Sequence, residues 1–383
     1  MSALYTGAGE LLIHHTLDAS NASIQTHDAL DLGSPIQYAW AHPSGRWLYV
    51  ATGHRGKADH AVHALWTCRI APRTGALSAH GEPLALTSRP IHLCTDPRGE
   101  HVYVAYNEPS AITVHPVQAD GRPGPVLPQP HPLDMGIFAH HIHVAPDGRH
   151  VLLVTRGNDA KPGRSEDPGA IKLLSQQAGE LRSLASVAPN GGYGFGPRDI
   201  DFHPNGRWLY ASIERQNRLQ VFGYGPQGIT PQPVFDVSNL NDPDPPRPRQ
   251  LVGTLKVHPK GHALYVVNRA DGVHPWDGCE VFAGGENNIA VYQLDAETGR
   301  PRPIQHADTQ SIYVRTIAMD PSGRLLVAAS VSGLPVRDGD EVRELGTALT
   351  VFRIHGDGTL HLAKRHTVDV GGRKQQWVGI VAL

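Results

Sequence analysis

The sequence predicts an all-β fold: a seven-bladed β-propeller of four-stranded blades, closed by the two ends of the chain. A turn motif of the form Pro-x-Gly returns six times at intervals of 49 to 62 residues, and a period of this size indicates a repeat architecture. Around each copy lie short apolar runs rich in β-branched and aromatic residues, without the longer 3.6-residue pattern of helices. The six copies occupy residues 42–50, 96–104, 146–154, 203–210, 258–266 and 320–327.

Each repeat contains the strands of one blade. The Pro-x-Gly turn joins two apolar runs into a β-hairpin, because Pro presets φ and Gly accepts positive φ. A third run follows, and a more variable fourth strand comes after a Gly-containing turn such as 297–300. Four short strands in a unit of this length are typical of a propeller blade. Third runs are found at residues 111–114, 218–222, 288–292 and 348–352.

The seventh blade is divided between the two ends of the chain. Residues 376–381 resemble a first strand, but no hairpin turn follows them, and residues 4–7 resemble a second strand that lacks its first. Pairing the two segments completes the ring and removes two open sheet edges. We therefore expect one domain over residues 1–383.

Composition excludes several classes of protein. The formal net charge is −2 and 18% of the residues are charged, so a nucleic-acid partner is not indicated. The sequence has no apolar run of 18 residues and no secretion-signal pattern, so no membrane partner is expected. Its three cysteines are scattered, which favours a reducing compartment and predicts a cytoplasmic protein. The sequence does not predict an oligomeric state.

Histidine is abundant, with 24 residues. Three of them, His42, His203 and His258, directly precede the turn proline in equivalent positions of three repeats. A residue repeated at the same place in a structural unit indicates a structural role. We expect these three side chains to stabilise the turns.

The repeats allow equivalent positions to be compared along one chain. In an antiparallel hairpin, residues at matching distances before and after the turn lie at the same end. Side chains six residues before and ten residues after each proline should therefore ring one mouth of the central channel. Convergent polar side chains at such a mouth mark a candidate binding site. The first set is Gln37, Ile91, His140, Arg198, Gly253 and Arg315, and the second is Gly53, Asn107, Arg156, Glu214, Arg269 and Val331.

Three long insertions leave the blades at the same face as this ring. They lie between the second and third strands, at residues 156–169, 270–286 and 332–346. Long loops gathered on one face commonly carry function, although each could be a neutral insertion.

Four segments carry a resemblance to a known family. They are Phe-Ala-His-His-Ile-His at 138–143, Gly-Pro-Arg at 196–198 before Phe-His-Pro, Ile-Glu at 213–214 and Val-Asn-Arg at 267–269. With them the chain resembles the seven-bladed lactonase family over nearly its whole length. That family includes bacterial 6-phosphogluconolactonases and fungal 3-carboxy-cis,cis-muconate lactonising enzymes.

The resemblance implies an active site and a class of substrate. The family's catalytic histidine, two arginines and glutamate fall on His140, Arg198, Arg269 and Glu214, which the ring of repeat positions also contains. The implied substrate is a small-molecule lactone or sugar acid. We expect further substrate-binding side chains at Arg156, Arg315, Asn107, Gln37 and His141.

These residue types suit the chemistry of a lactone. Arginine binds carboxylate or phosphate through a bidentate fork and can stabilise an oxyanion at the carbonyl. Glu214 among arginines should have a lowered pKa and stay ionised. His140 can act as an acid or a base near neutral pH. We expect Arg198 and Arg269 on the substrate anion or oxyanion, with Glu214 and His140 sharing the proton transfer.

Three functions compete for this site. The leading prediction is a lactonase acting on a sugar lactone in carbohydrate catabolism, similar to 6-phosphogluconolactonase. An intramolecular enzyme, either a lactone-ring isomerase or a muconate-type cycloisomerase, would use the same residues without an attacking water. A non-enzymatic propeller that serves as a binding scaffold is the third. The sequence departs from the family at Thr-Gly-His 52–54 and at His141, which bears on the choice of substrate.

No cofactor is predicted, although a divalent metal near His140, His141 and His143 stays open. On a strand, His141 and His143 share one face and His140 takes the other, which argues against three ligands of one ion. The arginines also need an offsetting charge. Acidic neighbours, Asp199, Asp201 and Glu166, could supply it instead of a bound anion.

Overall fold

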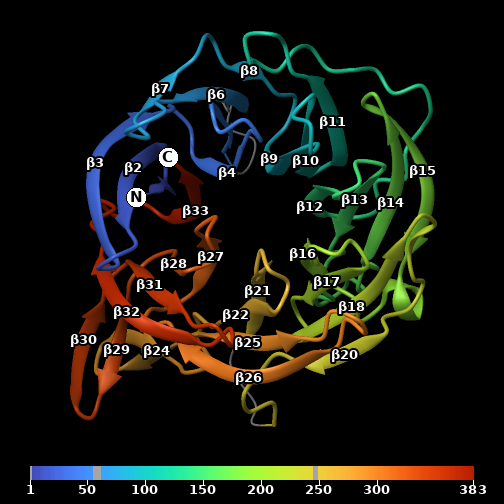
Figure 1. Ribbon diagram of the computed structural model, residues 1–383. Coiled ribbons are helices and arrows are strands. Elements are labelled where there is room, and N and C mark those ends of the chain that lie inside the picture. The colour runs from blue at the N-terminus through green and yellow to red at the C-terminus, as the bar shows by residue number, and fades with distance from the viewer. Residues whose placement is uncertain (1, 55–61, 245–248) are drawn as a thin grey trace.

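The computed structural model describes residues 2–54, 62–244 and 249–383. Over these residues, seven sheets of three to five strands surround a central axis, each with one strand nearest the axis (Figure 1). The described residues form no α-helix, only a 3-10 turn, η1 (Pro189–Gly192). Within the same ranges, no helix has the length and apolar character that crossing a membrane requires. The predicted propeller is confirmed.

Blades 1 to 3 follow one another along the chain, and in each the first strand is innermost. Blade 1 contains β4 (Ile36–Ala41), β5 (Trp47–Thr52) and β6 (Ala64–Ile70), with β7 (Leu77–Ala79) and β8 (Leu84–Ala85) both paired to β6. Blade 2 contains β9 (Pro90–Thr95), β10 (His101–Asn107) and β11 (Ser110–Pro116). Blade 3 contains β12 (Ala139–Val144), β13 (His150–Thr155), β14 (Ala170–Gln177) and β15 (Glu180–Val187).

Blades 4 to 6 repeat the same order. Blade 4 contains β16 (Pro197–Phe202), β17 (Trp208–Ile213) and β18 (Arg218–Gly225), with β19 (Gly228–Ile229) and β20 (Phe235–Ser238) both paired to β18. Blade 5 contains β21 (Leu251–Val257), β22 (Ala263–Arg269), β25 (Asn288–Leu294) and β26 (Pro301–Asp308). Blade 6 contains β27 (Val314–Met319), β28 (Leu325–Ser330), β31 (Ala348–Ile354) and β32 (Leu360–Thr367).

Blade 7 joins the two ends of the chain, as predicted. Its inner strand is β33 (Gln375–Ala382), which pairs with β1 (Ser2–Ala8), followed outward by β2 (Leu11–Asp18) and β3 (Ser23–Asp31). In the antiparallel register, Leu4 faces Ile380 and Thr6 faces Val378. Figure 1 shows both termini in this blade. Backbone hydrogen bonds between the first and last strands therefore close the ring.

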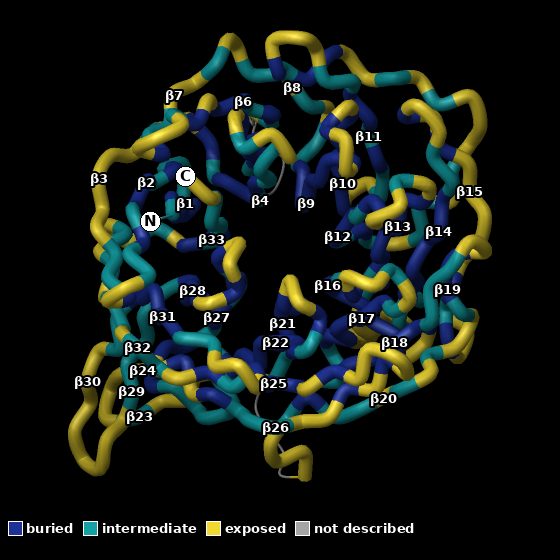
Figure 2. Tube along the Cα trace, viewed as in Figure 1, coloured by how far each residue is buried: buried dark blue, intermediate teal, exposed yellow. Residues whose placement is uncertain are grey.

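The apolar core lies between neighbouring blades. Leu152 of blade 3 and Leu209 of blade 4 are fully buried members of one cluster, and Leu4 of blade 7 shares another with Val327 of blade 6. Both faces of a blade are covered, so its middle strands read as nearly continuous apolar runs. In Figure 2 the inner strands are mostly buried, and exposed residues collect at the rim and in loops. Each blade thus depends on both neighbours for its burial.

The histidines before the turn prolines link one blade to the next. The Nε2 atom of His42 lies 3.0 Å from the carbonyl oxygen of Gly99, in the following turn. His203 makes the same contact with Gly261 at 2.8 Å, and His258 makes it with Gly323 at 2.9 Å. A carbonyl only accepts, so each Nε2 carries the donated proton. The predicted structural role is confirmed.

Blade 2 departs from the four-stranded expectation, since its sheet has three strands. Pro116 ends β11, and the segment that follows carries prolines at 123, 125, 128, 130 and 132. Proline has no N–H to give to a strand ladder, so a regular fourth strand cannot form there. Isolated bonds cover the edge instead, such as the one from the Leu127 amide to the Val114 carbonyl at 2.8 Å.

Two of the expected loops are β-hairpins. The insertion at 270–286 contains β23 (Val273–Trp276) and β24 (Cys279–Phe282), and that at 332–346 contains β29 (Leu334–Asp338) and β30 (Glu341–Leu345). The Arg337 guanidinium lies 3.4 Å from the Trp276 ring centroid and joins the hairpins. At the β23–β24 turn, Asp277 and Gly278 have φ of 44° and 79°. Asp-Gly is a hairpin signal that the sequence already contained.

Candidate active site at one mouth of the channel

A β-bulge interrupts the inner strand of every blade at an equivalent position. In each, the pairing register to the second strand shifts by one residue. A bulge leaves one residue unpaired and re-aims its side chain. The extra residues are Gln37, Ile91, His140, Arg198, Gly253 or Thr254, Arg315 and Gln376. The repeat comparison had selected six of these positions, and it lacked Gln376 because blade 7 has no Pro-x-Gly turn.

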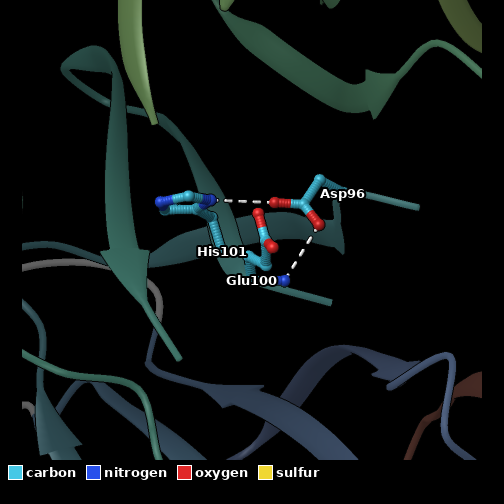
Figure 3. A group of neighbouring side chains, drawn as sticks. All are labelled: Asp96, Glu100 and His101. Atoms are coloured by element: carbon cyan, nitrogen blue, oxygen red, sulfur yellow. Dashed lines mark hydrogen bonds and ion pairs between the residues drawn. The ribbon is translucent and has the colours of Figure 1, made fainter. Parts of the chain in front are cut away.

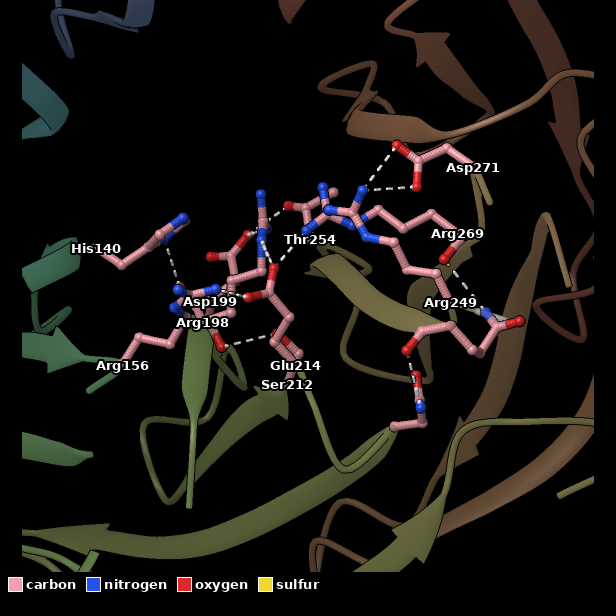
Figure 4. A network of polar contacts seen from close by, with 12 residues as sticks. His140, Arg156, Arg198, Asp199, Ser212, Glu214, Arg249, Thr254, Arg269 and Asp271 are labelled. Carbon is pink, nitrogen blue, oxygen red and sulfur yellow. Dashed lines mark hydrogen bonds and ion pairs between the residues drawn. The ribbon is translucent and has the colours of Figure 1, made fainter. Parts of the chain in front are cut away.

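Glu214 is the centre of a cluster of three arginines. It follows β17, and its Oε2 lies 2.6 Å from Nη1 of Arg156, which follows β13. Its Oε1 lies 3.1 Å from Nε of Arg198 on β16 and also accepts a bond from Nη2 of Arg269 at the end of β22. Figure 4 shows this network, in which blades 3, 4 and 5 each contribute a guanidinium. Glu214 therefore contacts three arginines, two of which, Arg198 and Arg269, are the predicted catalytic ones.

Burial makes this cluster electrostatically demanding. The side chains of Glu214, Arg198 and Arg269 are 4%, 5% and 3% exposed. Burial alone would raise the pKa of Glu214, but the charges of Arg269, Arg198 and Arg156 hold that pKa far below its usual range. The carboxylate is ionised and faces three cations. One negative charge cannot offset three positive ones, so the cluster favours an additional anion.

His140 stands beside this cluster as a neutral imidazole. Its Nδ1 lies 3.1 Å from the carbonyl oxygen of Arg198 (Figure 4). Because the carbonyl only accepts, Nδ1 carries the proton and Nε2 keeps its lone pair. Burial, reinforced by the charge of Arg198, holds the pKa of His140 well below its ordinary value. The side chain is therefore an unprotonated base at neutral pH.

Arg315 is the cation of the ring without a partner among the described residues. No hydrogen bond or ion pair joins its guanidinium to the described part of the chain. Burial, together with the charges of Arg198 and Arg269, lowers its pKa. It lines a cavity of about 560 Å³ at the channel mouth. The cavity walls are Gly9, Pro35, Gln37, Gly53, Arg89, Arg249, Asp271, Tyr313, Arg315, Val331, Lys374 and Gln376.

The cavity holds cations that the repeat comparison missed. Arg89 bonds to Gln37, and Arg249 lies 3.0 Å from Asp271. With Lys374 and Arg315, the described walls of this cavity carry four cationic side chains and one carboxylate, that of Asp271. Arg89, Arg249 and Lys374 each stand one or two residues before an inner strand, outside the positions compared from the turns. A cation directly before a first strand was the signal in the sequence.

Three predicted substrate-binding residues lie away from the described walls of this cavity, and the first of them, Arg156, pairs with Glu214 instead. Asn107 is buried at the end of β10 and is not among the described walls. His141 is buried deeper in the channel, where its Nδ1 lies 2.7 Å from Oδ1 of Asp199. Gln37 does line the cavity and donates to the carbonyl of Gly53 at 2.8 Å. The binding roles of Arg156, Asn107 and His141 stay predictions.

The acidic neighbours fall into two groups. Glu166 lies 3.6 Å from Arg215, so it offsets a cation outside the ring. Asp199 lies 3.9 Å from Nη1 of Arg198 and is also bonded to His141, so it offsets part of the ring's charge. The acidic neighbours therefore offset only part of the positive charge of the ring, and they leave the charge of Arg315 without a partner among the described residues.

Metal-ligand geometry in the described residues is confined to the turn of blade 2, where ligand atoms of Asp96, Glu100 and His101 lie within 4.8 Å of one another (Figure 3). Asp96 already accepts the Glu100 amide at 2.9 Å and His101 Nδ1 at 2.9 Å. These bonds explain the group as a cap on its own turn. The other metal position considered from the sequence was near His140, His141 and His143. There the centroids of the parallel rings of His141 and His143 are 5.8 Å apart, and His140 Nδ1 is bonded to the carbonyl oxygen of Arg198.

Comparisons with known proteins bear on this geometry. The family model for the lactonase, 7-bladed beta-propeller, matches residues 2–333. The 6-phosphogluconolactonase of Bacillus subtilis (strain 168) is 23% identical over 332 residues, 85% of each chain. That of Klebsiella pneumoniae (strain 342) is 24% identical over 359 residues, 92% of this chain and 90% of the relative. The periplasmic gluconolactonase of Pseudomonas aeruginosa shares the fold, with a TM-score of 0.75 at 20% identity and coverage of 100% and 99%.

Proposed function

The chain belongs to the seven-bladed β-propeller lactonase family, and we propose that it hydrolyses a sugar-derived lactone that carries an anionic group. One observation carries the proposal: a neutral histidine with a free Nε2 stands beside a cationic cluster that one carboxylate does not balance. Ring opening of a lactone needs a base for water and a positive site for the carbonyl oxygen. Among the described residues, His140 can supply the base and the arginine cluster can supply the positive site.

His140 is the base in this proposal. Its Nδ1–H is fixed on the Arg198 carbonyl, so Nε2 is held in one orientation with an available lone pair. Nε2 takes a proton from water as the water oxygen bonds to the lactone carbonyl carbon. When the ring C–O bond breaks, the same proton passes to the departing alkoxide. General acid–base catalysis of this kind contributes about 100-fold to 10,000-fold.

Arg198 and Arg269 stabilise the oxyanion that forms at the carbonyl. Both guanidiniums are buried and are held against Glu214, so they need little reorganisation during the reaction. In this arrangement Glu214 positions the arginines. Its three ion pairs and strongly lowered pKa make it a weak base, so we assign the proton transfer to His140 alone.

Arg315 and the rim of the cavity bind the anionic group of the substrate. Arg315, Arg249 and Lys374 line the same space of about 560 Å³, which suits a sugar-sized molecule. A phosphate or carboxylate there would satisfy a guanidinium that has no protein partner among the described residues. Gln37 and Gln376 also line this cavity and can bond to hydroxyl groups.

We propose a cytoplasmic location for this activity. Two of the three cysteines, Cys68 and Cys94, are buried free thiols, and Cys279 is an exposed one. Burial raises the pKa of Cys68 to about 12, which keeps it inert. An exposed unpaired thiol suits a reducing compartment. Cell fractionation with an antibody to the protein checks the location.

The test is the fate of the lactone. Glucono-1,5-lactone and its 6-phosphate are incubated with the purified protein, and the products are followed by carbon NMR and by acid release. Hydrolysis yields the open hydroxy acid and one proton per turnover, faster than buffer alone. A new lactone ring without acid release would instead establish an isomerase, and no change in either substrate or related lactones would leave a binding scaffold.

A matched pair of substrates tests the anion site. We expect Arg315→Ala to raise the KM for the phosphorylated lactone by about tenfold, and by less for the unphosphorylated one, because one charge-assisted contact is lost. Inorganic phosphate and citrate should compete with substrate in the wild type. Equal effects on both lactones would place the phosphate elsewhere.

A further inference from the structure

A second polar layer lies beneath the arginine cluster in the channel. Asp199 on β16 is the next residue after Arg198 and points to His141 on β12, with Oδ1 and Nδ1 2.7 Å apart. Its Oδ2 accepts a bond from the Thr254 hydroxyl. The side chains of His141 and Asp199 are 3% and 8% exposed. This is a buried carboxylate–histidine pair that the proposed hydrolysis does not use.

A small cavity connects this pair to the proposed active site. Its volume is about 20 Å³, enough for one water molecule. His140 and Arg315 line it from the arginine layer, and His141 and Asp199 line it from the layer beneath. The two histidines therefore face one shared, water-sized space.

Apart from Nε of Arg198, which forms an ion pair with Glu214, three buried polar atoms on this cavity lack a hydrogen-bond partner among the described residues. They are Nε2 of His92, Nε2 of His141 and Oγ1 of Thr316. His92 Nδ1 accepts the Ile142 amide at 3.4 Å, so the proton of His92 sits on Nε2 and needs an acceptor. A single water would accept that proton, donate to His141 Nε2 and bond to Thr316. Buried waters typically make about three such bonds.

The rings around His141 have little freedom to turn away. The centroids of His92 and His141 are 4.0 Å apart, and those of Tyr38 and His92 are 3.9 Å apart. Asp199 makes the direct bond to the His141 ring. The titratable and charged groups facing His141 are Tyr38 on β4, His92 on β9, His140 and His143 on β12, Arg198, Asp199 and Asp201 on β16, Lys256 on β21 and Arg315 on β27.

We propose that His141, held by Asp199, is a positioning residue that accepts the proton of the reaction from His140 through one water in this cavity. The proposal rests on the proposed lactone hydrolysis. Opening a lactone with water gives a hydroxy acid, whose carboxyl group then loses one proton. His140 Nε2 takes that proton, the cavity water receives it and gives one of its own to His141 Nε2. His141 becomes an imidazolium ion paired with Asp199, and His140 is again a free base.

Kinetics of three variants of the full chain test the relay. We expect His141→Gln to lower kcat about tenfold with KM within about twofold, because His141 does not line the cavity of about 560 Å³ proposed for the substrate. Thr316→Val, which is isosteric and removes one bond to the water, should lower kcat about threefold. His143→Gln is the matched control, since His143 stacks on His141 on the same strand but does not line the cavity. It should stay within twofold of the wild type.

Rates in mixtures of H₂O and D₂O separate a relay from a structural role. The wild-type kcat should depend on the deuterium fraction along a curve, because two protons move together, and His141→Gln should give a straight line. A tenfold loss in His143→Gln as well, or a wild-type straight line, would overturn the relay.

Histidine NMR on the protein alone gives a readout without turnover. Asp199→Asn removes a negative charge from the layer beneath His140 and should lower the titration midpoint of His140, whereas His141→Gln replaces one neutral side chain by another and should leave that midpoint nearly unchanged. A lowered midpoint in Asp199→Asn, in a protein that hydrolyses no lactone, would overturn the proposed function and keep the coupling between the two layers. Normal hydrolysis with no shift in Asp199→Asn would overturn the coupling between the two layers and keep the proposed function.

Discussion

The two halves of the ring share a backbone and differ in charge. Blades 3, 4 and 6 present His140, Arg198 and Arg315 at their bulges. Blade 5 has Gly253 or Thr254 at its bulge, and blades 3, 4 and 5 carry Arg156, Glu214 and Arg269 after or at the ends of their second strands. Blades 7, 1 and 2 have the same bulge but present Gln376, Gln37 and Ile91 there. Every blade therefore has the bulge, and the residue at the bulge decides whether that blade contributes a charged or basic side chain to the site.

This asymmetry orients the substrate. A lactone in the cavity meets Arg249 and Arg315 from blades 5 and 6, and it meets the bulge amides Gln37 and Gln376 beside the cations Arg89 and Lys374 from blades 7, 1 and 2. Charged groups attract the carbonyl and the anionic substituent, whereas amides bond to hydroxyls with little directional pull. Changes in blades 3 to 6 should therefore affect turnover strongly, and changes in blades 7 and 1 weakly. Both halves depend on closure of the ring by the pairing of β33 with β1.

Removing residues 376–383 should have the largest effect, because it erases the difference between the halves altogether. The deletion takes away nearly all of β33 and leaves β1 with an open edge. We expect loss of the cooperative thermal transition and aggregation, measured by circular dichroism and size-exclusion chromatography. A truncated protein with the wild-type melting temperature would show that blade 7 does not close the ring.

His140→Ala should give the largest loss in a folded protein. We expect kcat to fall by about 100-fold or more, the scale of a lost general base. His27→Ala, on the exposed outer strand β3, is the control and should leave kcat unchanged. The wild-type rate should be flat across neutral pH and fall only well below pH 6.5, because the lowered pKa keeps His140 unprotonated above that point. A rate that halves near pH 6.5 would contradict this environment.

Glu214→Gln should cost both activity and stability. The amide keeps the shape of the side chain but leaves three guanidiniums without their carboxylate. We expect about 100-fold lower kcat, and unfolding free energy reduced by about 3 kcal/mol, as for breaking a buried ion pair. Because the folded-state pKa is lowered, the stability from Glu214 is present above its unfolded pKa and is lost as pH falls below it. Glu297→Gln, at 85% side-chain exposure, is the control for both measurements.

Arg269→Ala should weaken the reaction without abolishing it. We expect kcat/KM to fall by the equivalent of about 2–4 kcal/mol, the range for removing one partner of a desolvated charge pair. Arg218→Ala, whose side chain is 39% exposed on β18, provides the comparison. Steady-state kinetics with added phosphate would also show weaker inhibition. Unchanged kinetics and inhibition in the Arg269 variant would make the arginines part of the scaffold.

Gln376→Ala probes the neutral half and should have the smallest effect. The amide lines the cavity and can contribute about one hydrogen bond to a substrate hydroxyl, worth about 0.5–1.5 kcal/mol. We expect a change of about tenfold at most in kcat/KM, confined to KM. A large loss of kcat would mean that the halves are not divided as described.

The repeat explains how much could be predicted from sequence. The bulge lies at a fixed number of residues before the Pro-x-Gly turn. The positions six residues before the turn proline therefore include His140, Arg198 and Arg315, which the sequence alone could identify. Counting forward reached Glu214 and Arg269. Contacts between blades, such as the one from Arg156 to Glu214, follow only from the way sheets stack.

The features that were missed have physical reasons. Arg89, Arg249 and Lys374 precede the inner strands, where insertions change the spacing from one repeat to the next. The Asp-Gly turn of the β23–β24 hairpin lay inside a segment read as a loop. The missing strand of blade 2 was signalled by its prolines, but the blade pattern outweighed them.

Closure of the ring also sets an order of events during synthesis. Ser2 faces Ala382 in the finished blade, so the first strand made waits for the last one. Arg156, Arg198, Glu214 and Arg269 span a much shorter stretch and can assemble before the chain is complete. The cavity wall formed by Gln376 arrives last. A nascent chain on the ribosome thus holds its charged cluster before it has an enclosed space in which to bind a substrate.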